Sequence, residues 1–206
     1  WIERYFKHPS YYRIQGRPVL MLYDLDVFVE SLGGVAAARE ALAWLRQEVK
    51  KADFPGLELQ LSMRGEIDFE GWVATSPQLT DQLGFDSLTH YVFVHFVNAG
   101  RDYAEVLKDA EREWQAVSTR YKAKYYPHVS VGFDTSPRAE QFTGPTITNN
   151  SPEAFEKGLR QAKRFVDAHP DQAPLITVNS WNEWTETSYL QPDDLNRYGD
   201  LEAIKR

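Results

Sequence analysis

Segments typical of strands and segments typical of helices alternate along the chain, and this order restricts the folds that it can adopt. Residues 18–23 form a short apolar run after a Gly-Arg-Pro turn, and residues 57–63 alternate apolar and polar side chains, so both predict strands. Three further strands are expected within residues 85–93, at residues 126–132 and at residues 175–179. The chain therefore offers five strands with helical sequence between them.

Four helices are expected in the intervals between these strands. Residues 35–52 place apolar side chains on one helical face, and residues 76–83 predict a shorter helix. A long helix is expected from an N-cap at Asp102 to about Lys122, and another begins at Ser151, which precedes a proline. Strands and helices in alternation imply an α/β fold with a parallel sheet covered by helices.

Two α/β folds fit this order, an open doubly wound sheet and part of a (β/α)8 TIM-type barrel. Five β/α units are too few for a complete barrel, which needs about 250 residues. The chain starts at Trp1 in mid-pattern, without an initiator methionine or a recognisable signal peptide. We therefore expect a single catalytic barrel domain over residues 1–206, incomplete at its N-terminus and comprising the last five or so β/α units, with further strands upstream.

Composition narrows the classes of partner. The net charge of -7 argues against nucleic acid as a partner, since phosphate binding needs clustered lysine and arginine. The chain has no cysteine and no apolar run of the roughly 18 residues that a membrane helix needs. Its five histidines show no ligand spacing, and no glycine-rich phosphate loop is present. We expect no metal, no cofactor and no membrane segment.

Chemically useful side chains follow each expected strand. Because the active site of a β/α barrel lies at the carboxyl ends of its strands, these positions are the candidates for a site. In strand order they are Tyr23 and Asp24, then Arg64 and Glu66, then His90 and Tyr91, then Asp134 and Arg138, and last the segment 181–186.

The last of these clusters is the most specific. It places two carboxylates, Glu183 and Glu186, among Trp181, Asn182 and Trp184 directly after a strand. Glycoside chemistry uses two carboxyl groups around an anomeric carbon, and tryptophan rings can stack on sugars and desolvate a carboxyl group. The alternative is a helix N-terminus, with Asn182 as the cap and the two glutamates favoured by the helix dipole.

The remaining candidates also have structural alternatives. Tyr23 fits either a pocket wall or the core, and Asp24 fits either a ligand of sugar hydroxyls or a turn. Tyr91 competes with its neighbour for the inward-facing position. Asp134 fits an Asx-type turn as well as a binding role. Arg138 could bind substrate or pair with an acid such as Asp134.

Several segments resemble glycoside hydrolase family 99 and its WbsX-like relatives. The resemblance is carried by residues 5–9, 11–19, 22–24, 131–138 and 177–193. The last segment contains the sequence Asn-Glu-Trp-x-Glu, which is shared with family 99 itself, whereas the rest of it is similar to the WbsX-type ending. The resemblance covers most of the chain at scattered positions and implies a (β/α)8 barrel.

Family 99 enzymes are retaining endo-α-mannosidases that act through a 1,2-anhydro sugar. The resemblance implies that Glu183 is the base that deprotonates the sugar 2-hydroxyl and that Glu186 is the general acid/base. The positions similar to substrate-lining residues of the family are Tyr23, Asp24, Tyr91 and Asp134.

Two residues depart from the family 99 pattern. Thr185 and Thr187 stand where family 99 usually has histidine and glycine, which matches the WbsX-like proteins better. Those proteins carry a glycosyltransferase label. Three hypotheses follow: a retaining glycoside hydrolase acting on a polysaccharide or oligosaccharide such as an α-mannoside, a glycosyltransferase in polysaccharide assembly, and a glycan-binding module without turnover. The presence of both glutamates argues against the third.

Overall fold

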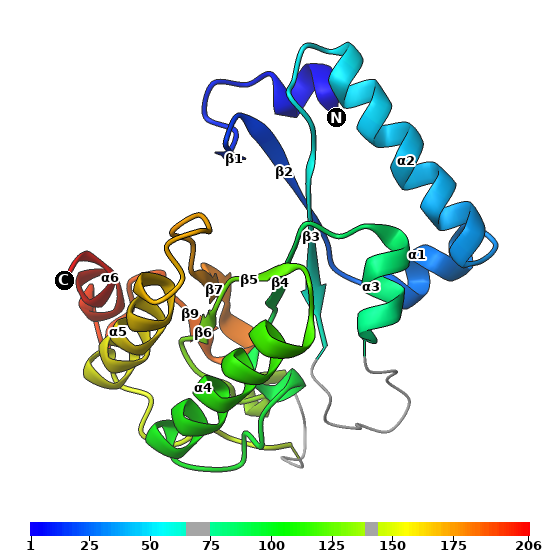
Figure 1. The fold of residues 1–206 in the computed structure, drawn as a ribbon. Coiled ribbons are helices and arrows are strands. Elements are labelled where there is room, and N and C mark those ends of the chain that lie inside the picture. The colour runs from blue at the N-terminus through cyan, green and yellow to red at the C-terminus, as the bar shows by residue number, and fades with distance from the viewer. Residues whose placement is uncertain (65–74, 139–143) are drawn as a thin grey trace.

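A computed structural model describes residues 1–64, 75–138 and 144–206 as a curled parallel sheet with helices packed on its outer side (Figure 1). The elements in chain order are the π-helical turn η1 (Ile2–Phe6), β1 (Arg13–Ile14), β2 (Arg17–Leu22), α1 (Leu25–Ser31), α2 (Val35–Lys51), β3 (Glu58–Met63), α3 (Pro77–Leu83), β4 (Ser87–His90), the 3-10 turn η2 (Phe93–His95), α4 (Tyr103–Arg120), β5 (Lys124–Tyr125), β6 (His128–Ser130), the 3-10 turn η3 (Ser136–Arg138), α5 (Pro152–Asp167), β7 (Thr177–Asn179), β8 (Asn182–Glu183), the 3-10 turn η4 (Trp184–Glu186), β9 (Ser188–Tyr189) and α6 (Gly199–Lys205).

The parallel strands follow one another across the sheet in chain order. β2, β3, β4 and β5 pair in parallel, and β6 pairs in parallel with β7. Pro127 separates β5 from β6, and it has no backbone N–H to donate to a neighbouring strand. Its carbonyl accepts a hydrogen bond from Thr177 N at 3.0 Å, whereas Tyr126 N donates to Leu88 O at 2.9 Å. The chain from β5 to β6 therefore pairs with β4 before Pro127 and with β7 after it.

A contact between two threonines demonstrates the curvature of the sheet. Thr89 Oγ1 in β4 and Thr177 Oγ1 in β7 lie 2.6 Å apart, although the β5–β6 segment runs between their strands. In a flat sheet two strands separated by a third lie about 10 Å apart, so the sheet must be strongly concave here. The concave face carries mostly polar side chains, which are Gln60, Ser62, Ser87, Thr89, His128, Ser130, Thr177 and Asn179.

The helices that follow β4 and β6 cover the convex face with an apolar interface. Trp114 of α4 is fully buried, and its ring lies 6.1 Å from that of Phe165 in α5. The predicted apolar stripe of α4 is buried along its whole length. Ser76, Asp102 and Ser151 cap α3, α4 and α5, because each side chain accepts a hydrogen bond from a backbone N–H group in the first turn of its helix. These caps confirm the predicted starts of α3, α4 and α5.

Besides the unpredicted short elements β1, β8, β9 and α6, the structure departs from the expected elements in three places. Helix α1 was not predicted, and Asp24 caps it by accepting a hydrogen bond from Val27 N at 3.1 Å. In place of the single strand expected at residues 126–132, the structure has two short strands, β5 and β6. The first of them starts before residue 126, because Lys124 already pairs with β4. The alternating pattern of β3 does not mark a solvent-exposed face, since all six residues are buried. Its polar face points into the concavity, as parallel strands covered on both sides allow.

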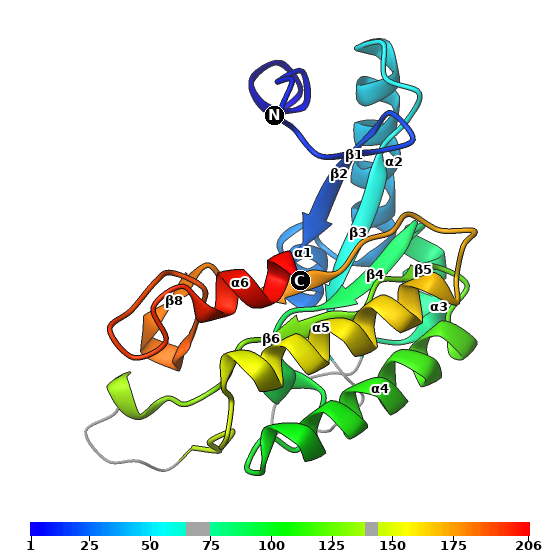
Figure 2. The ribbon, with the colours of Figure 1, turned by 90° about the vertical axis from the view of Figure 1, so that its left-hand side faces the viewer.

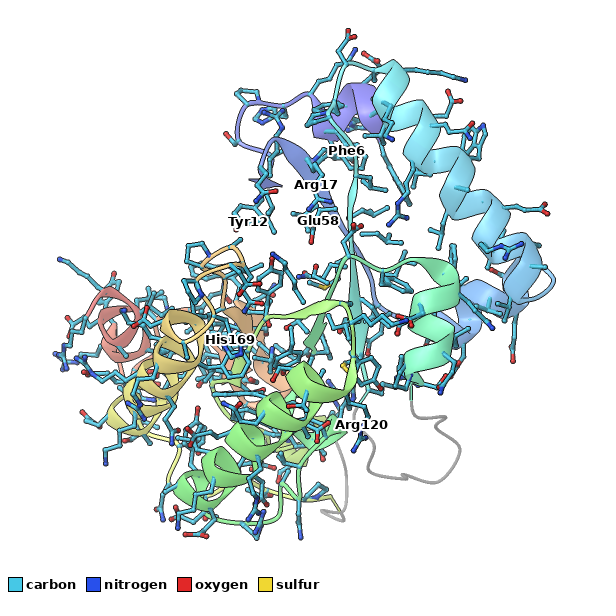
Figure 3. All side chains as sticks on the ribbon, viewed as in Figure 1. Phe6, Tyr12, Arg17, Glu58, Arg120 and His169 are labelled. Atoms are coloured by element: carbon cyan, nitrogen blue, oxygen red, sulfur yellow. The ribbon has the colours of Figure 1, made fainter. Side chains whose placement is uncertain are left out.

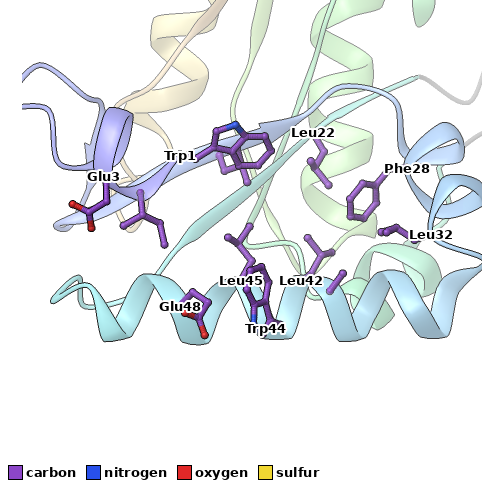
Figure 4. Close-up of a pocket in the computed structure, with 12 residues that line it drawn as sticks. Trp1, Glu3, Leu22, Phe28, Leu32, Leu42, Trp44, Leu45 and Glu48 are labelled. Carbon is purple, nitrogen blue, oxygen red and sulfur yellow. The ribbon is translucent and has the colours of Figure 1, made fainter.

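The N-terminal region extends away from the rest of the sheet (Figure 2). An ion pair joins the first residues of its two long strands, Arg17 of β2 and Glu58 of β3 (Figure 3). Burial raises the pKa of Glu58, and Arg17 opposes that rise. Between η1, β2, α1 and α2 lies an apolar pocket of about 550 Å³ to which Trp1 and Trp44 contribute (Figure 4). None of the candidate site residues lines it.

Within the described ranges, no helix combines the length and the hydropathy required to traverse a bilayer.

Candidate active site

The segment that follows β7 folds into a tight hairpin made of β8, η4 and β9. Ser180 stabilises the hairpin from within, because its hydroxyl donates to Ser188 O at 2.9 Å and accepts from Glu183 N at 3.1 Å. The hairpin is also attached to the loop after β6, since Asp134 N donates to Glu186 O at 2.9 Å. Both glutamates are therefore held at the carboxyl end of the sheet by backbone hydrogen bonds.

The hairpin shows that the helix-cap interpretation of this segment is wrong. Asn182 lies in a short antiparallel strand and not at a helix N-terminus. The following turn η4 is a single 3-10 turn without a side-chain cap, and it ends at Thr187 in a left-handed conformation. The chain turns back into β9 at that point, so no helix dipole explains the positions of Glu183 and Glu186.

One arginine joins the two carboxylates. Arg138 Nη2 lies 3.2 Å from Glu183 Oε1, and Arg138 Nη1 lies 3.1 Å from Glu186 Oε1. The same Nη2 donates to Thr185 Oγ1 at 2.7 Å, and that hydroxyl donates to Glu183 Oε1 at 2.8 Å. Arg138 precedes Glu183 by 45 residues in the sequence. It nevertheless forms one hydrogen-bonded cluster with Glu183 and Glu186.

The two carboxylates have different environments. Glu183 is the more exposed and receives two donors on Oε1, from Thr185 and Arg138. The side chain of Glu186 is only 16% exposed, and its Oε2 is buried without a hydrogen-bond partner among the described residues. Desolvation raises the pKa of Glu186, the Arg138 guanidinium lowers it, and the Glu183 charge raises it again, with desolvation the largest effect.

The loop that carries Arg138 is organised by Asp134. Asp134 Oδ1 accepts from Ser136 N at 2.8 Å and from the Ser136 hydroxyl at 2.5 Å. This is the Asx-type turn that the sequence allowed as an alternative to a binding role. The sequence suggested an acid such as Asp134 as a partner of Arg138. In the structure Arg138 pairs with Glu183 and Glu186.

An aromatic surface adjoins the carboxylates. Trp184 stacks on Tyr189, with ring centroids 3.7 Å apart and planes at 18°, and its indole N–H donates to Gln191 Oε1 at 2.6 Å. The indole is nevertheless 43% exposed, so it is fixed on one side and accessible on the other. Trp181 is also exposed. Exposed, immobilised aromatic rings of this kind are suited to stacking against the apolar faces of sugar rings.

Two tyrosines belong to the same neighbourhood. Tyr91, after β4, packs edge-on against Tyr23, after β2, with ring centroids 4.8 Å apart. Desolvation is the main reason why the pKa of Tyr91 is raised, and the charges of Glu186 and Glu183 add to the effect. Tyr91 therefore lies within electrostatic reach of both carboxylates. The adjacent His90 is fully buried and bonds to the Tyr125 hydroxyl at 2.7 Å.

The structure thus brings together only some of the candidate site residues. The cluster unites Glu183, Glu186 and Arg138, with Tyr91, Tyr23 and Trp184 beside them. Asp24 pairs with Arg64 at 2.9 Å while it caps α1, and Asn182 is exposed at the hairpin. The candidate Glu66 lies outside the described residues. Across the three described ranges, no group of three or more potential ligands is placed to hold a metal ion.

Two residues that hold side chains of the candidate site, Thr185 and Gln191, were not predicted as site residues. Thr185 was noted only as a departure from a family pattern, although a hydroxyl two residues after a glutamate can reach its carboxylate. Gln191 fixes the Trp184 indole, and nothing in the sequence indicates that contact, because it depends on how the hairpin closes.

The fold and the cluster define an α/β protein with part of a barrel and a carboxylate pair at the carboxyl end of its sheet. The family model described as Glycosyltransferase WbsX matches residues 1–204, and the chain belongs to this family.

Two curated relatives and two solved structures extend this comparison. An uncharacterized protein named WxcX, from two strains of Xanthomonas campestris pv. campestris, is 26% identical over 210 residues, and the chain spans 29% of its length. Two structures of the GH99 endo-alpha-mannosidase from Bacteroides thetaiotaomicron, one in complex with BIS-TRIS-propane, align with TM-scores of 0.62 at 18% and 17% identity. They match 99% of this chain and 60% and 57% of their own chains, and they share its fold.

Proposed function

We propose that the chain carries the catalytic carboxylates of a retaining glycoside hydrolase that acts on a polysaccharide or oligosaccharide. The observation that carries the proposal is the unequal environment of Glu183 and Glu186. Glu183 accepts two hydrogen bonds on one oxygen, which orients the carboxylate so that its other oxygen can accept a proton, as a base must. A desolvated carboxyl group with a raised pKa suits an acid.

The resemblance to family 99 implies that these two groups act through a 1,2-anhydro sugar, and we propose that route for this chain. Glu183 accepts the proton of the sugar 2-hydroxyl, O2 forms a bond to C1, and the bond from C1 to the leaving oxygen breaks as Glu186 donates its proton to that oxygen. In the second step Glu186 accepts a proton from water, the water oxygen bonds to C1, and the C1–O2 bond breaks as Glu183 returns its proton to O2. Two inversions at C1 give overall retention.

The same geometry supports a glycan as the substrate. Trp184, and Trp181 next to the pair, offer exposed ring faces of the kind that stack on sugars. The structural neighbours are called endo-alpha-mannosidases, so α-mannoside oligosaccharides are the first substrates to test.

A glycosyltransferase is the second candidate, and the family description is what favours it. A transferase that uses a nucleotide sugar must bind a diphosphate, for which arginines are well suited. Two arginines that follow strands of the sheet pair with acids, Arg138 with the two glutamates and Arg64 with Asp24. This pairing makes hydrolysis the better-supported reaction.

Both candidates are tested by one assay on the whole protein. A panel of end-labelled oligosaccharides, α-mannosides included, is incubated with enzyme alone and with nucleotide sugars. We expect cleavage without any nucleotide sugar, and we expect Glu183→Gln and Glu186→Gln to lower kcat by at least about 1,000-fold, as losses of paired catalytic groups do. The matched control is Glu40→Gln on the exposed face of α2, which should leave kcat unchanged.

Two results would reject the proposal. Cleavage that persists in both glutamine variants would show that the carboxylates are not the catalytic groups. Product that lengthens only when a nucleotide sugar is present would identify a transferase.

A further inference from the structure

The hydroxyl of Thr185 occupies a specific place in the cluster, between the arginine and one glutamate. Its Oγ1 lies 2.7 Å from Arg138 Nη2 and 2.8 Å from Glu183 Oε1. A guanidinium has only donors and a threonine hydroxyl has a single hydrogen, so Thr185 must accept from the arginine and donate to the glutamate. The direction of both hydrogen bonds is therefore fixed by chemistry.

The donors then converge on one oxygen of Glu183. Thr185 Oγ1 and Arg138 Nη2 both point at Oε1, at 2.8 and 3.2 Å. A carboxylate held at one oxygen by two donors cannot rotate freely about its last side-chain bond. The other oxygen, Oε2, is thereby set in a defined direction for accepting a proton.

Thr185 is the more persistent of these two donors. It lies two residues from Glu183 on the same turn, so its hydroxyl stays near the carboxylate whatever binds. Arg138 is a long, partly exposed side chain shared with Glu186, and its guanidinium lies between the two carboxylates where a sugar must approach. A substrate that displaces the arginine leaves the threonine in place.

We propose that Thr185 is a positioning residue that orients the Glu183 carboxylate for proton abstraction from the substrate. The proposal rests on the hydrolase function proposed above, and it concerns how the base of that reaction is held. Thr185 is itself exposed, and among the hydrogen bonds described its side chain contacts only Arg138 and Glu183, so its hydroxyl serves this cluster.

The test compares two substitutions at this position in the whole protein, on an oligosaccharide that the unaltered enzyme cleaves. Thr185→Val keeps the branched shape and removes the hydroxyl, and it should lower kcat by about 10- to 100-fold with KM within about 2-fold, as expected for a lost bond to a charged group that acts in the transition state. Thr185→Ser restores the hydroxyl and should keep kcat within about 3-fold of the unaltered enzyme.

Controls separate this proposal from the function on which it rests. Thr119→Val removes an exposed hydroxyl that donates to Gln115 O within α4, and it should change neither kcat nor KM. The melting temperatures of all these variants should match that of the unaltered protein. A crystal structure of Thr185→Val should show Glu183 turned from its present orientation.

The outcomes are distinguishable. If Glu183→Gln abolishes cleavage while Thr185→Val does not alter kcat, the positioning role is wrong and the hydrolase stands. If Thr185→Val changes only KM, or if Thr185→Ser loses as much activity as Thr185→Val, the hydroxyl does not orient the base. If no oligosaccharide is cleaved, or if Glu183→Gln stays active, the proposed function fails and the positioning role fails with it.

Discussion

Two tryptophans, one on α4 and one on α2, show how differently the two flanks of the sheet are built. Trp114 on α4 is 0% exposed and packs against Phe165 of α5. Trp44 on α2 is 61% exposed and lies at the edge of the apolar pocket (Figure 4). Both helices carry an amphipathic pattern, yet only the α4 flank buries its largest side chain within this chain.

The candidate site residues are also distributed unevenly between these two flanks of the sheet. The hairpin with Glu183 and Glu186 and the loop with Arg138 belong to the same C-terminal region as α4 and α5, whereas β2 contributes only Tyr23 and Asp24 beyond its end. The residues expected to move protons therefore rest on the densely packed region. The open pocket near Trp44 is typical of a surface that another segment or another molecule covers.

The largest effect on stability is expected in the packed region. Trp114→Ala removes a fully buried indole and leaves a cavity beneath α5, so it should lower the free energy of unfolding by about 3–5 kcal/mol. Denaturant unfolding of the whole protein, followed by circular dichroism, measures this. A loss below about 1 kcal/mol would mean that the α4 flank does not hold the C-terminal region together.

An intermediate effect is expected at the charged cluster that this region supports. Arg138→Gln removes the cation that lowers the pKa of Glu186, so that pKa should rise further. A higher pKa keeps the general acid protonated to higher pH, and the alkaline limb of the kcat profile should therefore move toward higher pH. The maximal rate should fall about 10-fold, because a charge-assisted contact to the base is also lost.

The control for this profile is Arg39→Gln, an exposed arginine on α2. It should leave both the alkaline limb and the maximal rate unchanged. A profile for Arg138→Gln that keeps its alkaline limb, or moves it toward lower pH, would contradict the assignment of Glu186 as the acid.

The smallest effect is expected in the open region. Trp44→Ala truncates a mostly exposed side chain and should change the free energy of unfolding by no more than about 0.5 kcal/mol. The same unfolding experiment on the whole protein measures it, with Trp114→Ala as the matched comparison. A loss close to that of Trp114→Ala would show that Trp44 is buried by a further part of the protein.

The order of elements could be predicted from the sequence because hydrophobic periodicity and capping residues are local signals. Ser76, Asp102 and Ser151 marked helix starts that the structure confirms. Helix α1 was missed because its Leu-Asp-Val-Phe-Val sequence, rich in β-branched residues, follows a strand directly, although Asp24 is a typical N-cap. The sequence allowed Asp24 as a ligand of sugar hydroxyls or as a turn residue, and the structure shows it as the N-cap of α1.

The position of the segment with the two glutamates could likewise be predicted, but its internal contacts could not. A strand followed by Glu183 and Glu186 places both at the carboxyl end of a sheet. The contact of Arg138 with both depends on a loop more than 40 residues away, and no local pattern encodes it. For the same reason the hairpin could not be predicted in place of a helix cap at Asn182, because it depends on pairing with residues further along the chain.

The contact between Thr89 and Thr177 has a consequence for the shape of anything that binds. Because the polar side chains of the concave face meet one another, the interior of the curled sheet is already filled below the carboxylates. A glycan at the site would rest on a floor and could not enter a tunnel. We expect it to lie across the mouth of the fold.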